Sequence, residues 1–186
     1  MIFASTHVRA GTATTSGCVV AIVVLGAAVA RAGQPAPVSP ATSEALALCD
    51  QADRVPVLER ATVLARGLDR AEEAVRMDAQ DAVAHFAVFC NLGKRLQMEQ
   101  SGFRLFVPLA ELSRARNELD VALRLVPDYA AALAAKGEML VELPRLLGGD
   151  AREGELLLRR AAASDPDDRR IRGMLANAAQ IVGGRD

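Results

Sequence analysis

The stretch ARNELDVALRLVPDYAAALAAKG, residues 115–137, decides the fold that we predict for this chain. Apolar or small residues at positions 115, 119, 122, 123 and 126 recur at the spacing of one helix face, with charged residues between them. Pro127 disfavours the helical conformation at Val126 and has no amide hydrogen to donate, so this helix ends there. A second, alanine-rich segment opens at Tyr129. The stretch therefore predicts two helices joined by a tight turn.

The same kind of helix end occurs three times along the chain. Ala122 and Ala161 each stand five residues before a proline, and Ala74 has the same place relative to Ala79. An acidic residue that can cap the next helix follows each end. The three alanines are separated by 48 and 39 residues. This repetition predicts a stack of helical hairpins.

Periodicity, prolines and capping residues predict seven helices joined by short turns. Breaks in the pattern fall at residues 98–107 and 143–149. The last helix is opened by Asp167 or Asp168 and ends near Val182, before Gly183 and Gly184. The other expected helices cover residues 41–54, 57–77, 82–97, 108–126, 128–143 and 150–163.

Composition and charge favour an all-α protein with one core and no affinity for nucleic acid. The chain has 186 residues, of which 51% are hydrophobic, and it lacks tryptophan. Residues 1–32 contain two arginines and no acid, so the remainder has 20 bases against 23 acids, a net charge of −3. A long basic face is therefore not available.

The first 32 residues are predicted to be a secretory signal. Arg9 precedes a polar segment and then the apolar run CVVAIVVLGAAVA, residues 18–30, which is too short to span a bilayer. Small residues favour cleavage after Ala32. An uncleaved N-terminal anchor is the alternative, and only that alternative predicts membrane association. We expect a proline-rich linker at 33–40, a helical domain at 41–182 and a tail at 183–186, in an exported protein that is periplasmic or secreted.

These helix ends resemble those of tetratricopeptide (TPR) repeats. The small residue of the family's second helix corresponds to Gly67, Ala115 and Gly154, and its large apolar residue to Ala71, Leu119 and Leu158. The repeat spacings exceed the strict period of 34 residues, and the first-helix motif is matched only in part. The resemblance implies an α-solenoid of about three hairpins over residues 41–182, closed by a C-terminal capping helix. The long loops within repeats give a weaker resemblance to the periplasmic TatT-type proteins that accompany TRAP transporters.

The segment LPRLLGGD, residues 143–150, is predicted to be a structural turn. Pro144 ends one helix, Gly148 and Gly149 permit positive φ, and Asp150 caps the next helix. Glycines before a helix N-terminus can also bind an anion, but the lysine of a P-loop is absent.

The residues after position 32 offer little catalytic chemistry. They include one histidine, His85, which we expect to be a packing residue, and two cysteines, Cys49 and Cys90. The cysteines form a disulfide if the chain is exported, or remain buried thiols. The spacing of these residues predicts neither a metal site nor a cofactor. We therefore expect a protein that is not an enzyme.

The TPR resemblance implies a groove lined by the first helix of each hairpin. Its positions fall on Phe86 and Lys94 in the second hairpin and on Glu138 and Glu142 in the third. A groove of mixed charge suits a peptide or a partner helix, so we expect a protein partner in the cell envelope. The alternatives are that these are ordinary surface charges, or that the protein is a ligand-binding accessory component of a transport system.

Overall fold

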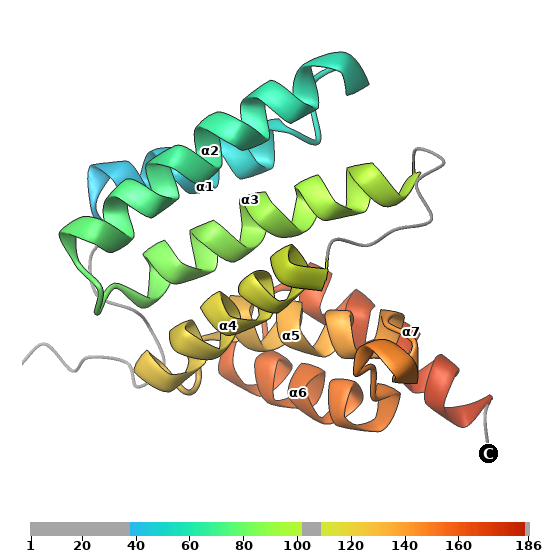
Figure 1. Cartoon of the computed structure of the whole chain (residues 1–186). Coiled ribbons are helices and arrows are strands. Elements are labelled where there is room, and N and C mark those ends of the chain that lie inside the picture. The colour runs from blue at the N-terminus through green and yellow to red at the C-terminus, as the bar shows by residue number, and fades with distance from the viewer. Residues whose placement is uncertain (1–37, 102–108, 185–186) are drawn as a thin grey trace, which may run out of the picture.

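A computed structural model describes residues 38–101 and 109–184, with the side chains of 99–101 left aside. The predicted signal, most of the linker, Pro108 and most of the break at 98–107 lie outside these ranges. The described residues form seven α-helices and one short 3-10 helix, η1 (Figure 1). Their bounds are α1 Pro40–Gln51, α2 Val57–Met77, α3 Ala82–Ser101, α4 Leu109–Leu125, α5 Ala130–Glu142, η1 Arg145–Leu147, α6 Ala151–Ser164 and α7 Arg169–Gly183. No helix in these ranges is long and apolar enough to cross a membrane.

The helices pair as three hairpins, α1 with α2, α3 with α4 and α5 with α6, and α7 packs on the last of them (Figure 1). This is the predicted all-α solenoid with a C-terminal capping helix. The hairpins are stacked in chain order, so each neighbouring pair shares a layer of apolar side chains.

The helix ends follow the capping residues of the sequence with three corrections. Asp150 and Asp168 each accept two backbone amide hydrogen bonds at the starts of α6 and α7, as predicted. The first correction concerns two helix bounds: Tyr129, and not Asp128, is the N-cap of α5, and α1 ends at Gln51 instead of residue 54. Ser39 caps α1, which begins at Pro40.

The second correction concerns α3, which continues to Ser101 instead of ending at residue 97. Met98, assigned to the break in the pattern, packs against the cluster formed by Leu48, Ala52, Val63 and Leu64. This apolar contact holds the extra turn of α3 against the first hairpin. The third correction is that the expected loop at 143–149 contains the single turn of η1.

Small residues at the predicted repeat positions lie where helices cross. Gly67, Ala115 and Gly154 are all buried in the second helices of the hairpins. The terminal alanines Ala74, Ala122 and Ala161 are exposed by no more than 2%. The backbones of α5 and α6 approach closely at Gly137 and Gly154, each of which faces the carbonyl oxygen of the other. These positions explain why small residues recur in the sequence.

The first two hairpins are joined by polar and covalent links between α1 and α3. The Thr42 hydroxyl donates to Asp81 over 2.9 Å, and the Asn91 side-chain amide donates to the Ala45 carbonyl oxygen over 3.1 Å. Cys49 and Cys90 form a disulfide between the same two helices. The joint is therefore covalently closed.

The joint between the second and third hairpins is non-covalent among the described residues. Leu119, Ala122 and Ala132 form its buried apolar layer. The Lys136 ammonium on α5 donates to Asp120 on α4 over 2.7 Å, and Arg116 on α4 donates to the Leu147 carbonyl oxygen in η1. The two joints of the solenoid thus differ in kind.

Candidate partner-binding face

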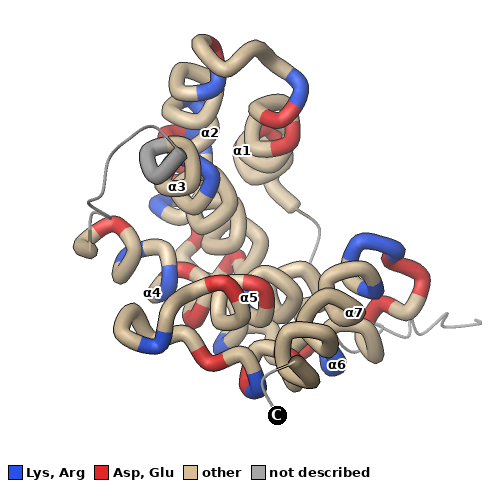
Figure 2. Tube along the Cα trace, turned by 90° about the vertical axis from the view of Figure 1, so that its right-hand side faces the viewer, with Lys and Arg blue, Asp and Glu red and all other residues tan. Residues whose placement is uncertain are grey.

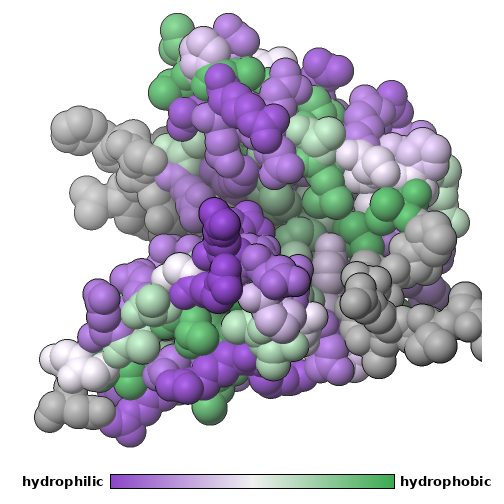
Figure 3. Space-filling model, turned by 180° about the vertical axis from the view of Figure 1, so that it is seen from behind, coloured by the Kyte–Doolittle hydropathy of each residue, from purple (hydrophilic) through white to green (hydrophobic). Residues whose placement is uncertain are grey.

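The first helices of the hairpins are neighbours of one another or of α7, because α1 packs against α3 and α5 packs against α7. Figure 2 shows α1 and α7 toward its right-hand side, while α3 lies on the left beside α2 and α5 lies between. The side of α1 and α7 is the one that faces the viewer in Figure 3. Figure 3 shows this side from behind, where the surface is hollowed between the first two hairpins and the lower group α5–α7. Apolar surface lies within the hollow, and hydrophilic surface surrounds it. We call this side the concave face.

Phe86 of α3 contacts the start of α5. Its ring centroid is 5.3 Å from that of Tyr129, in an edge-to-face arrangement, and 6.1 Å from that of Phe89. All three rings are half-buried and pack against the apolar layer between α4 and α5. Phe86 therefore has a packing role at the second joint, with part of its ring exposed.

Lys94 of α3 is turned toward α1. Its ammonium donates to the Cys49 carbonyl oxygen over 2.9 Å and to the Asp53 carboxylate over 2.6 Å. The cation is thus neutralised within the protein, next to the disulfide. Since Phe86 faces α5, these two predicted groove residues do not form one cluster.

Glu138 and Glu142 lie one turn apart on α5, where Figure 2 shows acidic residues along the helix. Glu138 is half-buried, and within the described residues it makes no hydrogen bond or ion pair. Burial raises the pKa of the Glu138 carboxyl, the negative charge of Glu142 raises it further, and Arg170 of α7 opposes both effects. This carboxylate is partly desolvated without receiving a hydrogen bond in return.

Negative charge also acts on Tyr129 at the other end of α5. Burial, and secondly the charge of Asp81, raise the pKa of the Tyr129 hydroxyl to about 12. Asp81 is the residue that accepts the Thr42 hydroxyl and the amides of Val83 and Ala84. The aromatic pair therefore lies beside a fixed carboxylate.

A partly buried pair that the sequence did not indicate joins α3 to α4. His85 Nδ1 lies 2.6 Å from a Glu118 carboxylate oxygen, and His85 Nε2 lies 3.1 Å from the Ala79 carbonyl oxygen. A ring nitrogen must carry hydrogen to donate to an oxygen acceptor, so the tautomer of His85 decides which of the two contacts is a hydrogen bond. His85, which we expected to be a packing residue, thus also connects α3 to α4 through Glu118 and to the preceding turn through Ala79.

Replacing Glu118 by alanine is expected to lower the free energy of unfolding by about 2 kcal/mol, because His85 then loses a charge-assisted hydrogen bond inside the protein. Urea titration followed by circular dichroism measures this change. Glu73→Ala, which breaks the exposed pair of Glu73 with Arg70, is the matched control and should cost less than about 0.5 kcal/mol. Equal losses in the two variants would contradict the role assigned to the buried pair.

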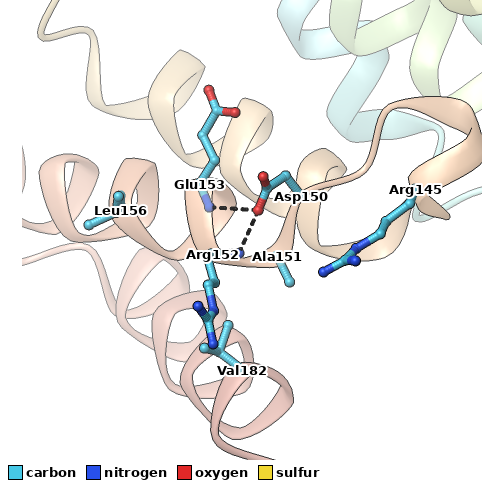
Figure 4. A pocket seen from close by; sticks show the side chains of 7 residues that line it. All are labelled: Arg145, Asp150, Ala151, Arg152, Glu153, Leu156 and Val182. Carbon is cyan, nitrogen blue, oxygen red and sulfur yellow. Dashed lines mark hydrogen bonds between the residues drawn. The ribbon is translucent and has the colours of Figure 1, made fainter. Parts of the chain in front are cut away.

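A second hollow lies at the C-terminal end of the solenoid, beside η1, the start of α6 and the end of α7 (Figure 4). It has a volume of about 510 Å³. Residues from η1, the first turns of α6 and the end of α7 line it: Arg145, Asp150, Ala151, Arg152, Glu153, Leu156 and Val182. The turn beside it is built as predicted, with Gly148 at φ 81° and Asp150 capping α6.

No group of three or more histidine, cysteine, aspartate or glutamate side chains in the described ranges is placed to hold a metal ion.

No protein-family model matches the chain, and no curated protein matches it. Among solved structures, it is similar to the first TPR domain of Spaghetti (RPAP3), solved with the HSP90 peptide SRMEEVD. The two share 13% sequence identity with a TM-score of 0.49, over 76% of this chain and 95% of that chain. The likeness concerns the fold alone.

Proposed function

We propose that this chain is a non-catalytic protein-interaction module exported to the cell envelope. In this proposal the concave face binds a protein or peptide partner, with Glu138 and Glu142 as the charged contacts. Phe86 and Tyr129 supply apolar surface beside them. Lys94 is left out of the binding set because its charge is already engaged by Asp53.

The half-buried carboxylate of Glu138 is the observation that supports this proposal most directly. A carboxylate that is partly removed from water and receives no hydrogen bond costs the folded state free energy. Such a group is retained at functional sites more often than elsewhere, because a ligand can supply the missing partner. A lysine or arginine side chain of the partner would pair with Glu138 and Glu142 together.

Replacing Glu138 by glutamine is expected to stabilise the free protein at pH 7. A carboxyl whose pKa is raised by folding destabilises the folded state above its folded-state pKa, and this cost is absent below the pKa of the unfolded chain. The gain should stay below about 1 kcal/mol, because the side chain is half exposed to solvent. Thermal unfolding of both proteins between pH 7 and pH 4 should show the difference shrinking as the pH falls.

Asp69→Asn removes an exposed carboxylate from α2, in another hairpin than Glu138, and is the control for this measurement. It should change stability by less than about 0.5 kcal/mol at either pH. If Glu138→Gln is instead less stable than the natural protein at pH 7, the carboxylate has a stabilising partner and the site is wrongly assigned.

Affinity purification from the cell envelope, with mass spectrometry of proteins and small molecules, tests the proposed function. A partner retained by the natural chain and by Asp69→Asn, but lost from Glu138→Gln, supports binding at the concave face. A small molecule without a protein partner would instead support a ligand-binding accessory role in transport. In the same preparation, a chain beginning at residue 33 would support export with cleavage after Ala32.

A further inference from the structure

The first helix of the solenoid depends on its neighbours for its place. α1 has 12 residues, and an isolated helix of about that length is marginal in water. Its buried apolar side chains are Ala45, Leu48 and Cys49, of which only Leu48 is large. Because small side chains remove little apolar surface from water, specific links are needed to hold α1 against α3. The disulfide of Cys49 with Cys90 is the covalent link between these two helices.

Further links from α1 to α3 are hydrogen bonds. The Asn91 side-chain amide donates to the Ala45 carbonyl oxygen over 3.1 Å. The Lys94 ammonium donates to the Cys49 carbonyl oxygen over 2.9 Å. A hydrogen bond exchanges with water and adds only modest stability, whereas a disulfide opens only through a chemical reaction. The hydrogen bonds therefore orient α1, and the disulfide keeps it in place.

The two cysteines differ in their access to solvent. Cys49 is 0% exposed, whereas Cys90 is only half-buried. Thiol–disulfide exchange begins when a thiolate attacks one sulfur of the bond, and access is one of the factors that decide which sulfur it is. A reductant in solution therefore meets the bond at Cys90.

We propose that the disulfide is a redox-operated latch: a dithiol attacks it at Cys90, and breaking it releases α1 from α3 while the second and third hairpins stay folded. One thiolate of the dithiol bonds to Cys90 Sγ, and Cys49 Sγ leaves with the electron pair and takes a proton. The second thiolate then displaces Cys90 Sγ and closes the disulfide of the dithiol. The protein gains two electrons and two protons, which the dithiol loses.

The latch acts at the concave face, because α1 lies on that side of the solenoid (Figures 2 and 3). Opening the bond frees one edge of this face and leaves α5, with Glu138 and Glu142, in the part of the solenoid that stays folded. The latch is a property of the chain alone. It can therefore be tested without a partner, and the result does not depend on the proposed function.

Hydrogen exchange of the full chain, before and after reduction with dithiothreitol, measures the release of α1. The measured quantity is the exchange rate of amides 46–51 in α1 divided by the rate in the middle of α5 and α6. Reduction should raise this ratio at least about 10-fold, because α1 then opens without the rest of the solenoid. A smaller change overturns the proposal, since α1 then leaves α3 only when the whole molecule unfolds.

The site of attack is tested with glutathione, whose single thiol stops at the mixed disulfide. Peptide mass spectrometry, at early times after the protein is mixed with glutathione, locates the first adduct. It should be found on Cys90 at least about 10-fold more often than on Cys49, because Cys49 is buried until the bond opens. A smaller excess overturns the assignment of the attack to Cys90.

Lys94→Met is the matched control, because it removes a hydrogen bond to α1 and keeps the disulfide. In the oxidised variant the exchange ratio should rise less than about 5-fold over that of the oxidised natural chain. A rise as large as the one that reduction causes overturns the proposal. In that case the hydrogen bonds, and not the disulfide, hold α1 on α3.

Discussion

Gly154→Ala is expected to lower the free energy of unfolding by about 2 kcal/mol. A Cβ atom at this position would lie 2.6 Å from the Gly137 carbonyl oxygen and 2.7 Å from Val141 Cγ2. The carbonyl oxygen belongs to the backbone of α5 and cannot rotate away, so α5 and α6 must separate. Overpacking of this kind costs about 1–3 kcal/mol or more, and it exceeds the roughly 1 kcal/mol that alanine gains over glycine inside a helix.

Gly173→Ala is the matched control for this variant. Gly173 is also inside a helix, α7, but a Cβ atom there would have no neighbour within 4 Å. The substitution should therefore raise the free energy of unfolding by up to about 1 kcal/mol. Urea titration of the two variants measures effects of opposite sign. If both variants were more stable than the natural protein, α5 and α6 would not cross as closely as described.

Removing the disulfide with the double substitution Cys49→Ala and Cys90→Ala is expected to cost about 4 kcal/mol. The crosslinked residues are 41 positions apart, so the bond closes a long loop in the unfolded chain and reduces its conformational entropy. The loss is measured as the difference between the urea unfolding curves of the oxidised protein and the double variant.

Reductant provides the control for the disulfide. Dithiothreitol should destabilise the natural protein by a similar amount and leave the double variant unchanged. Thiol titration first confirms that the natural protein contains the bond. If its unfolding curve then does not change with reductant, the crosslink does not constrain the unfolded state. The first hairpin depends most on the bond, because α1 is only 12 residues long.

Much of the fold could be predicted from the sequence because its determinants are local. The apolar periodicity and flanking residues of α2 gave its bounds, 57–77, without error. Asp150 and Asp168 act within three residues of their own positions, so capping was also predictable. The helix ends at Ala74, Ala122 and Ala161 recur along the chain, and this recurrence predicted the hairpins.

The details of the candidate site depend on contacts between residues far apart in the chain. The pairing of Lys94 with Asp53 spans 41 positions, and that of His85 with Glu118 spans 33. Neither pair has a sequence signal, because each requires the relative placement of two helices. For the same reason, the two alternatives for Cys49 and Cys90 stayed open until the structure placed α1 against α3. Glu138 and Glu142 could be placed on one helix face, but the partial burial of Glu138 could not be predicted.

The disulfide between α1 and α3 also determines where the solenoid can bend. The disulfide closes α1, α2 and α3 into one covalent loop, so we expect these three helices to move together as one arm. The crossing at Gly137 and Gly154 makes α5 and α6 a second arm, with α7 packed on it. The pivot then falls at the apolar layer of Leu119, Ala122 and Ala132. A rotation about this pivot would change the width of the concave face. Phe86 and Tyr129 lie beside the pivot, so we expect the contact between their rings to change first.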